Sequence, residues 1–432
     1  MSANVVINKS PSVAVRPPEP AAPETGCDID LSPYDKMFVG AAPATVFLVF
    51  EHPIHEPAET VRRGLSRALV HYYPIAGRLD ADEAVIRCTG GGVAFVAARA
   101  DCAMNDVKDF SDPSLQEELA IFYPATSYSQ SQSQSQSQSR PLALVQVTAF
   151  SCGGFVVAVT WDHAVCDGGG LAQFLQAVGE LARGLPAPSV VPVRTSDALT
   201  LPSPPPFSTD FMQFMASSLE PCPMELLDIT IPSSLISRIK HDYSLKTRGK
   251  PCSAFDAVAA VLWRCRTRAV MSRPEDLTVL AFTENARGYA GARAGYYGNC
   301  VTAQPVTATS GAVASSGVLE LVQMIRRGKE RVPDRSDMDR LRTRKLVGYN
   351  LLGMTSWRGL GLEVPDFGGG RPARVMGYWR DRRTSLPVCA ACLPCKDDYN
   401  VVSMCVREEH ANAFRHELAM MQHNPLSSSS KL

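Results

Sequence analysis

The order of apolar segments along the chain constrains its fold more than any other feature. Short runs rich in β-branched and aromatic residues, such as 44–50, indicate buried strands, and they alternate with segments such as 59–71 whose apolar residues recur at helical spacing. A strand at 142–150 leads into another at 155–161 through Ser151-Cys152-Gly153-Gly154, a turn compatible with a hairpin. Because strands and helices interleave without regular βαβ spacing, mixed sheets are favoured over a doubly wound parallel sheet.

The length of the chain favours two domains. It has 432 residues, of which 45% are hydrophobic, enough to bury two ordinary cores. We therefore expect an α/β protein with an N-terminal domain over residues 1–190 and a C-terminal domain over residues 226–432, joined by a Pro-rich linker at 191–225. Further elements are expected in the second half, namely helices at 253–266, 318–331 and 340–351 and a strand at 277–282.

The charge balance argues against several kinds of partner. Lysine plus arginine and aspartate plus glutamate number 43 each, so no net field attracts the chain to nucleic acid or to an anionic membrane. The longest apolar runs are too short to span a bilayer, and the N-terminus lacks the pattern of a secretory leader. We expect a soluble, non-secreted monomer.

The cysteines are interpreted as reduced thiols. Thirteen of them, an odd count, are scattered through apolar segments, which is typical of an intracellular protein. Cys389, Cys392 and Cys395 form a C-x2-C-x2-C run that could bind zinc or an iron–sulfur cluster. The residues between them are apolar, as in a strand, and no second Cys/His pair has ligand spacing. We expect no metal.

His163 is the strongest candidate for chemistry. Of the eight histidines, only His163 is followed four residues later by an aspartate, Asp167. An H-x3-D match alone is weak, and a buried histidine beside a helix cap is the ordinary alternative. Here an apolar strand leads into the histidine and three glycines follow the aspartate, which predicts an imidazole at a sharp, rigid turn. An imidazole titrating near neutrality can remove the proton of a hydroxyl as that oxygen attacks a thioester.

Two roles are open for Asp167. It could orient the His163 ring, as in a catalytic triad, or it could stabilise the loop as a buried carboxylate paired with an arginine. Arg287, in Asn285-Ala286-Arg287, is the candidate partner, and the structural role is the favoured one. The signatures G-x-S-x-G, G-x4-G-K-[ST], H-E-x2-H and strand-linked G-x-G-x2-G are absent from the sequence, which argues against a covalent serine enzyme or a nucleotide hydrolase.

The chain ends in Ser430-Lys431-Leu432, behind a run of serines. This tripeptide at a C-terminus is read by the peroxisomal import receptor, which makes that receptor an expected partner and the peroxisome the expected location. The alternative is a chance tripeptide on a frayed tail of a cytosolic protein.

Five motifs, in order, resemble those of the BAHD family of plant acyl-CoA-dependent acyltransferases, and the likeness covers nearly the whole chain. They are Tyr72-Tyr73-Pro74-Ile75-Ala76-Gly77-Arg78-Leu79, the H-x3-D-G at His163 to Gly168, Tyr296-Tyr297-Gly298-Asn299-Cys300, Thr355-Ser356-Trp357 and Asp366-Phe367-Gly368.

The resemblance implies a chloramphenicol acetyltransferase-like fold of two similar domains with mixed sheets flanked by helices and an active-site channel between them. It also implies direct transfer from acyl-CoA, a co-substrate, to a small hydroxylated acceptor, with no bound cofactor and no acyl-enzyme. Roles by motif position follow: His163 as base; Asp167, Gly168, Arg287, Asp366 and Gly368 as structural residues; Asn299, Thr355 and Trp357 at the reaction centre; and Ser253 near the coenzyme A path.

One departure concerns the last motif, in which the family's D-F-G-W-G has become Asp366-Phe367-Gly368-Gly369-Gly370. Losing an aromatic side chain is expected to lower stability or loosen the channel before it removes activity. It also keeps open a second class of function, a catalytically silent protein that binds coenzyme A.

Several features resemble the branch that includes benzoyl-CoA:benzyl alcohol benzoyltransferases. They are the Tyr-Tyr-Gly-Asn-Cys motif, the Gly-Gly-Phe strand start and the late Pro-Asp-Phe-Gly. Rivals are a hydroxycinnamoyl- or acetyl-CoA donor, another alcohol or an amine acceptor, and a condensation-domain relative that uses carrier-bound acyl groups. Asp162 argues against a condensation-domain relative, because that class normally has a second histidine at this position.

Overall fold

The computed structural model describes residues 5–18, 28–107, 109–110, 112–124, 140–201, 203, 209–211, 214, 222–271, 273–330, 339, 341, 348–378, 380, 383–384, 386–391 and 398–423. The Ser-Gln repeat at 129–139, Cys392, Cys395 and the C-terminal Ser430, Lys431 and Leu432 lie outside these ranges. Predictions that rest on those residues stay predictions.

The chain forms two compact units, and neither is a continuous stretch. Unit 1 contains Met1–Pro204, Ala286–Val301 and Arg358–Arg380, and unit 2 contains Pro205–Asn285, Thr302–Trp357 and Asp381–Leu432. The contiguous domains predicted at 1–190 and 226–432 therefore need correction for two segments of the second half. Composition and periodicity report local structure, whereas these segments join unit 1 through pairing and hydrogen bonds with residues far away in sequence.

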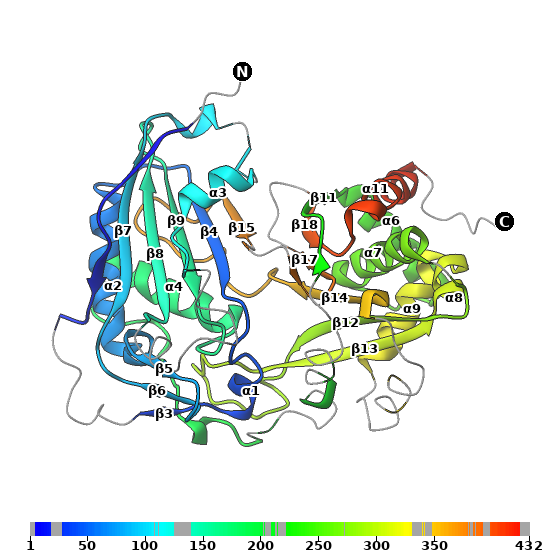
Figure 1. The fold of residues 1–432 in the computed structure, drawn as a ribbon, viewed down its shortest axis with the longest axis horizontal. Helices are drawn as coiled ribbons and strands as arrows, with labels where there is room; N and C mark the ends of the chain where they lie inside the picture. The colour runs from blue at the N-terminus through cyan, green and yellow to red at the C-terminus, as the bar shows by residue number, and fades with distance from the viewer. Residues whose placement is uncertain are drawn as a thin grey trace. The chain divides into compact units, whose positions relative to one another are not determined.

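Unit 1 is built on a 7-stranded mixed sheet with the order β1-β7-β8-β9-β4-β15, in which β2 also pairs with β7 (Figure 1). β7 and β8 are parallel, whereas β8, β9, β4 and β15 pair antiparallel. The strands are β1 (Ile7–Lys9), β2 (Val13–Val15), β4 (Ala44–Phe50), β7 (Val93–Ala100), β8 (Ala143–Ala149), β9 (Phe155–Trp161) and β15 (Arg374–Tyr378). Three short strands, β3 (Ile29–Asp30), β5 (Arg78–Asp80) and β6 (Val85–Arg87), form a separate sheet.

The large sheet of unit 1 is buried on both faces, which explains why β4 and β9 are continuous apolar runs and do not alternate. One face packs against the side of α3 (Pro113–Leu119), through a cluster that includes Phe47, Val156 and Leu119. On α2 (Pro57–His71), Gly64 lies so close to α4 (Gly168–Ala182) that an added Cβ would be 2.5 Å from the Val178 carbonyl oxygen. Glycine at this crossing allows the two helix backbones to approach closely.

Unit 2 has a 6-stranded sheet with the order β11-β18-β17-β14-β12-β13. Its strands are β11 (Leu227–Ile231), β12 (Leu277–Asn285), β13 (Val301–Thr309), β14 (Leu351–Ser356), β17 (Val388–Ala391) and β18 (Tyr399–Met404), and a small pair is formed by β10 (Cys222–Pro223) and β16 (Arg383–Thr384). Figure 1 shows its helices gathered together: α6 (Ser233–Lys246), α7 (Ala254–Val270), α8 (Ser310–Ser315), α9 (Val318–Lys329) and α11 (Glu408–His423). The central helix α7 is buried over most of its length, and with the helices around it forms a core cluster against the sheet.

Most predicted elements are present, with shifted ends. The prediction of a helix at 340–351 is wrong for its last residues. A 3-10 turn at Gly348–Asn350 leads into strand β14, which begins at Leu351. The apolar spacing of residues 351–354 fits both a helix and a strand. Only the pairing of these residues with β12 and β17 shows that they form a strand.

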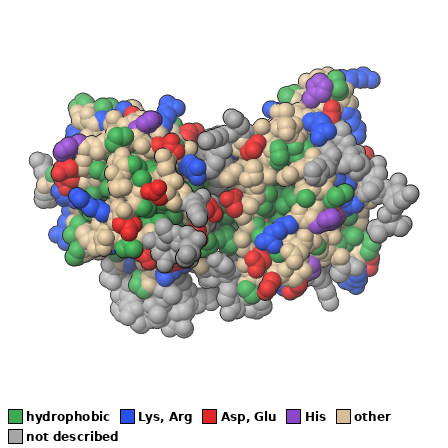
Figure 2. All heavy atoms as spheres, turned by 90° about the horizontal axis from the view of Figure 1, so that it is seen from above, with side chains coloured by type: hydrophobic (Ala, Val, Ile, Leu, Met, Phe, Trp, Pro, Cys, Tyr) green, Lys and Arg blue, Asp and Glu red, His purple; other side chains and the backbone are tan. Residues whose placement is uncertain are grey.

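The distribution of charge and the character of the helices bear on the partners of the protein. On the face drawn in Figure 2, lysine and arginine side chains are interspersed with aspartate and glutamate, in keeping with 43 residues of each sign. Among the described residues, no helix has the length and apolar character needed to cross a membrane.

Candidate active site

His163 lies directly after β9, in a short loop that ends at the first residue of α4. Two bonds hold this loop from inside: the Ala164 amide donates to the Asp162 carboxylate at 3.0 Å, and the Trp161 indole donates to the Cys166 carbonyl at 3.1 Å. The Asp162 carboxylate also pairs with Arg140. The backbone around the imidazole is therefore fixed by buried hydrogen bonds, as the sequence predicted for a rigid turn.

The imidazole of His163 is partly buried and held on two sides. The Phe38 ring stacks on it with centroids 4.2 Å apart and an angle of 18° between the planes. Its Nδ1 lies 3.1 Å from the side-chain oxygen of Asn299. These contacts leave the ring one well-defined orientation.

The hydrogen bonds of Asn299 decide which nitrogen of His163 carries the proton. The Asn299 amide nitrogen donates to the His163 carbonyl oxygen at 2.8 Å and to the Asp35 carboxylate at 3.0 Å, and both of these groups only accept. The amide oxygen must therefore face Nδ1, which has to donate a proton to it. This network assigns the hydrogen to Nδ1 and leaves the lone pair on Nε2.

Burial lowers the pKa of His163 below its ordinary value of 6.5, while the negative charge of Asp167 opposes that shift. A base must be neutral to accept a proton, so a lower pKa keeps the imidazole active to a lower pH.

We expect the acid limb of the pH profile of kcat/KM to lie below pH 6.5, with the rate at pH 6.5 already above half of its plateau. The profile can be recorded between about pH 5 and pH 8, the range in which histidine titrates. A limb centred above pH 6.5 would contradict the effect of burial.

Asp167 has a different set of partners. Its carboxylate receives two hydrogen bonds of 2.9 Å from the Arg287 guanidinium, one on each oxygen. The Gly170 amide, in the first turn of α4, donates to it at 2.9 Å and the Cys300 amide at 3.0 Å. The pairing with Arg287 predicted from the sequence is present. Nδ1 of His163 is held by Asn299, so the geometry fits the structural role of Asp167 and not the triad.

The glycines after Asp167 allow two segments to approach closely. A Cβ on Gly170 would lie 1.9 Å from the Tyr297 carbonyl oxygen, and one on Gly168 would lie 2.7 Å from Leu360. Residues 286–301 thus rest directly against the start of α4, which brings Asn299 to His163.

The loop with the altered last motif lies elsewhere in unit 1. Asp366 accepts from the Gly368 amide at 2.8 Å and the Gly370 amide at 2.9 Å, and its carboxylate is 3.1 Å from Arg183. Gly368 has a φ of 118°, which disfavours any side chain there. A Cβ on Gly369 would lie 2.9 Å from Ile54, so the segment beside it already fills this space.

Three residues expected at the site belong to unit 2. The Ser253 hydroxyl accepts from the Asp256 amide at 3.1 Å and caps the N-terminus of α7. Thr355 lies on β14, where its hydroxyl accepts from Thr283 at 3.2 Å, and the Trp357 amide donates to Ala391 at 2.8 Å. Their proximity to the acyl group stays a prediction.

Sequence reasoning missed three residues of the His163 surroundings: Phe38, Asp35 and Arg194. Phe38 has no distinguishing sequence signal. Asp35 has one, since Ser32-Pro33-Tyr34-Asp35 has the spacing of a capping box with proline at the first helical position, and the structure shows that box at α1 (Pro33–Lys36). Arg194 falls in the segment assigned to the linker, for which no functional role was predicted.

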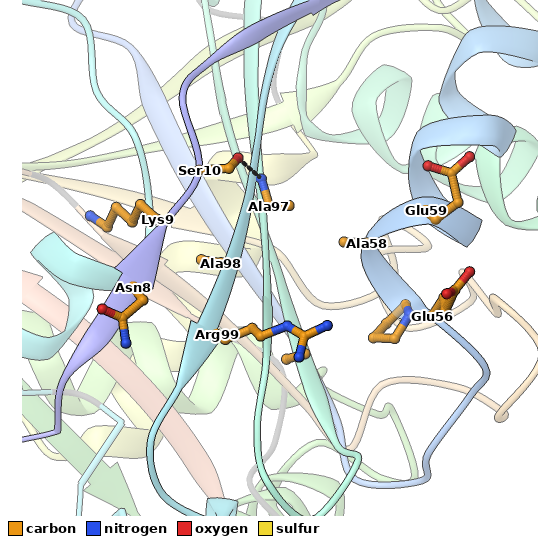
Figure 3. Close-up of a pocket in the computed structure, with 11 residues that line it drawn as sticks. Asn8, Lys9, Ser10, Glu56, Ala58, Glu59, Ala97, Ala98 and Arg99 are labelled. Carbon is orange, nitrogen blue, oxygen red and sulfur yellow. Dashed lines mark hydrogen bonds between the residues drawn. The ribbon is translucent and has the colours of Figure 1, made fainter.

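A groove on unit 1 is separate from this site. It has a volume of about 600 Å³ and lies between β1, β7 and the start of α2 (Figure 3). Four alanines line it together with the charged side chains of Lys9, Arg99 and Glu59. None of the residues around His163 contributes to its lining. Within the described residues, no group of three or more His, Cys, Asp or Glu side chains is placed to hold a metal.

Comparisons with known proteins define the class. The model of the "Transferase family" matches residues 8–421. Acyl transferase 15 of Oryza sativa subsp. japonica is 42% identical over 97% of this chain and 99% of its own length. A myricetin 3-O-glucosyl 1,2-rhamnoside 6'-O-caffeoyltransferase of Crocosmia x crocosmiiflora is 33% identical over 95% of this chain and 98% of its own.

The structure of vinorine synthase shares the fold, with a TM-score of 0.75 at 19% identity, covering 98% of this chain and 99% of the other. Fold and sequence thus define an acyl-CoA-dependent acyltransferase. The chain belongs to the BAHD branch of the Transferase family, as the five motifs indicated.

Proposed function

We propose that the protein transfers an acyl group from coenzyme A directly to the hydroxyl of a small alcohol, with Nε2 of His163 as the general base. The observation that carries the proposal is the bond from Nδ1 to Asn299 at 3.1 Å, which leaves the lone pair on the other ring nitrogen. A lowered pKa keeps that nitrogen unprotonated at neutral pH.

In the proposed reaction the alcohol oxygen attacks the thioester carbonyl while Nε2 takes its proton. A carbon–oxygen bond forms, the carbon–sulfur bond breaks, and the imidazolium returns the proton to the departing thiolate. Atoms and charge balance without any cofactor or covalent enzyme intermediate. The nearby Asp167 carboxylate favours the transient imidazolium through its charge.

For the substrates we propose benzoyl-CoA and benzyl alcohol, which react to benzyl benzoate. Support comes from the motif likeness to benzoyltransferases and from the terminal Ser430-Lys431-Leu432, since aromatic acyl-CoAs formed by side-chain shortening arise in peroxisomes. The likeness to the Crocosmia 6'-O-caffeoyltransferase favours a second candidate, a hydroxycinnamoyl donor with a larger acceptor.

A substrate panel with the purified full-length protein tests this proposal. Benzoyl-, caffeoyl-, p-coumaroyl- and acetyl-CoA are each offered with benzyl alcohol, a monolignol, a flavonoid glycoside and an amine, and thiol release is followed together with product formation. The highest kcat/KM for benzoyl-CoA with benzyl alcohol is the expected result. Preference for another pair overturns the substrates, and coenzyme A binding without thiol release overturns the transfer reaction itself.

We also propose that the protein resides in peroxisomes, because the chain ends in Ser430-Lys431-Leu432 and a C-terminal Ser-Lys-Leu is a peroxisomal address read by the import receptor. A fluorescent protein fused to the N-terminus leaves that end free. Deleting Ser430, Lys431 and Leu432 is expected to move the fusion to the cytosol. Peroxisomal fluorescence that persists after the deletion contradicts the proposal.

A further inference from the structure

Asp35 is a buried carboxylate that does not contact His163 itself but contacts Asn299, the partner of the His163 ring. It is fully buried, on the short helix α1, and its side chain completes a capping box with Ser32. One oxygen accepts from the Asn299 backbone amide at 2.9 Å and from the Asn299 side chain at 3.0 Å. The other accepts from the Ser32 amide at 2.9 Å and the Ser32 hydroxyl at 2.7 Å.

Arg194 supplies the counter-charge to Asp35. Its guanidinium lies 3.1 Å from the second carboxylate oxygen and donates to the Val165 carbonyl oxygen, also at 3.1 Å. The Arg194 side chain is only 5% exposed, so the pair is shielded from water. Both oxygens of Asp35 are thus surrounded by hydrogen-bond donors.

The arrangement forces one orientation on the Asn299 side chain. Turning its amide by half a turn would place the amide oxygen against the Asp35 carboxylate and the His163 carbonyl oxygen. Three acceptors would then face each other in a buried site, and each unmade hydrogen bond costs about 1–3 kcal/mol. The amide oxygen that meets Nδ1 is therefore determined by the charge on Asp35.

We propose that Asp35, held by Arg194 and Ser32, is a positioning residue that orients the Asn299 amide so that His163 keeps its proton on Nδ1 and presents Nε2 to the substrate. The inference rests on the proposed role of His163 as the base. Asp35 touches neither the ring nor a reacting atom, and acts through Asn299.

The same short segment holds the ring by a second route. The Phe38 amide donates to the Asp35 carbonyl oxygen at 2.9 Å, and the Phe38 ring stacks on the imidazole. Residues 32–38 thus set both the tautomer of His163, through Asn299, and its plane, through Phe38. A purely structural capping box would give no reason for either contact.

The first test uses the wild-type protein without substrate. Long-range proton–nitrogen NMR of protein labelled with ¹⁵N-histidine, above the pKa of His163, distinguishes the two neutral tautomers, with the His163→Gln variant assigning the signals. A protonated Nδ1 and an unprotonated Nε2 are expected. A dominant Nε2–H tautomer overturns the proposal, whether or not His163 proves to be the general base.

The second test uses Asp35→Asn, with Glu180→Gln as the matched control. Glu180 is also a buried carboxylate of unit 1 that accepts from a backbone amide and a hydroxyl, both of Ser189, and is outside the His163 network. For Asp35→Asn we expect an Nε2–H signal to appear and kcat to fall about 10- to 100-fold, because an imidazole whose Nε2 carries the hydrogen cannot act as the base. The KM should stay within about threefold of the wild-type value.

For Glu180→Gln both kcat and the tautomer should stay as in the wild type. A folded Asp35→Asn protein with wild-type kcat and an unchanged tautomer overturns the proposal. If Asp35→Asn does not fold, the tautomer seen in the wild-type spectrum decides the proposal alone. If neither the wild type nor the variants show turnover, the tautomer signals of wild type and Asp35→Asn still test the positioning role.

Discussion

Replacing His163 by alanine is expected to lower kcat by about two to four decades, the range for loss of a general base, while the Kd for coenzyme A stays close to that of the wild type. Without the imidazole the alcohol must lose its proton to water during attack on the thioester. The measurement is the rate of thiol release under single-turnover conditions, because a slow product-release step would otherwise mask part of the effect.

A control variant excludes a general loss of structure. His71→Ala changes an exposed histidine at the end of α2 and is expected to leave kcat unchanged. The melting temperature of His163→Ala should stay near the wild-type value, since Asp167, Asn299 and their partners keep their buried hydrogen bonds to the backbone. Ester formation by His163→Ala at the wild-type rate would show that the proton leaves by another route.

How far the sequence predicts this site depends on how local each interaction is. Strand β9, the turn after it and the start of α4 lie within one stretch of chain, so apolar patterning and the glycines after Asp167 predict them. The same is true of β4, whose predicted and observed ends agree at Ala44 and Phe50. These elements place His163 at a strand end without any knowledge of the second half of the chain.

The remaining contacts bring together parts of the chain that are far apart. Asn299 reaches His163 across 136 residues of sequence and Asp35 across 264. Periodicity carries no information about such pairs, and neither Asn299 nor Arg194 belongs to a local pattern that indicates burial. Arg287 was predicted because a buried carboxylate requires a cation, an electrostatic argument that does not depend on sequence distance, and because the family resemblance gave it a structural role.

The predicted division into two contiguous domains differs from the observed units for a related reason. Strand β15 belongs to the sheet of unit 1 because it pairs with β4, as Gly377 does with Val46. A prediction from composition assigns each stretch to the domain of its neighbours in sequence, so a strand that crosses over is assigned wrongly. Resemblance to a family adds the motif order but not the pairing.

Asp167→Ala is expected to lower the free energy of unfolding by about 3–5 kcal/mol, the range for removing one partner of a buried ion pair. The substitution leaves the Arg287 guanidinium without its carboxylate and the Cys300 amide without its acceptor. It also removes the side-chain cap of α4. Chemical denaturation, followed by intrinsic fluorescence and by activity, measures the loss.

Two further variants separate this structural role from a catalytic one. Asp167→Asn keeps the volume and one acceptor oxygen but not the charge, so it should be destabilised less than the alanine variant while retaining measurable turnover. Asp167→Ala combined with Arg287→Met removes both charges and should recover part of the lost stability, because a buried pair replaced by apolar groups leaves no unpaired ion. An Asp167→Asn protein as stable as the wild type but without turnover would instead show that the charge of Asp167 serves mainly the chemistry at the imidazole and not the stability of the loop.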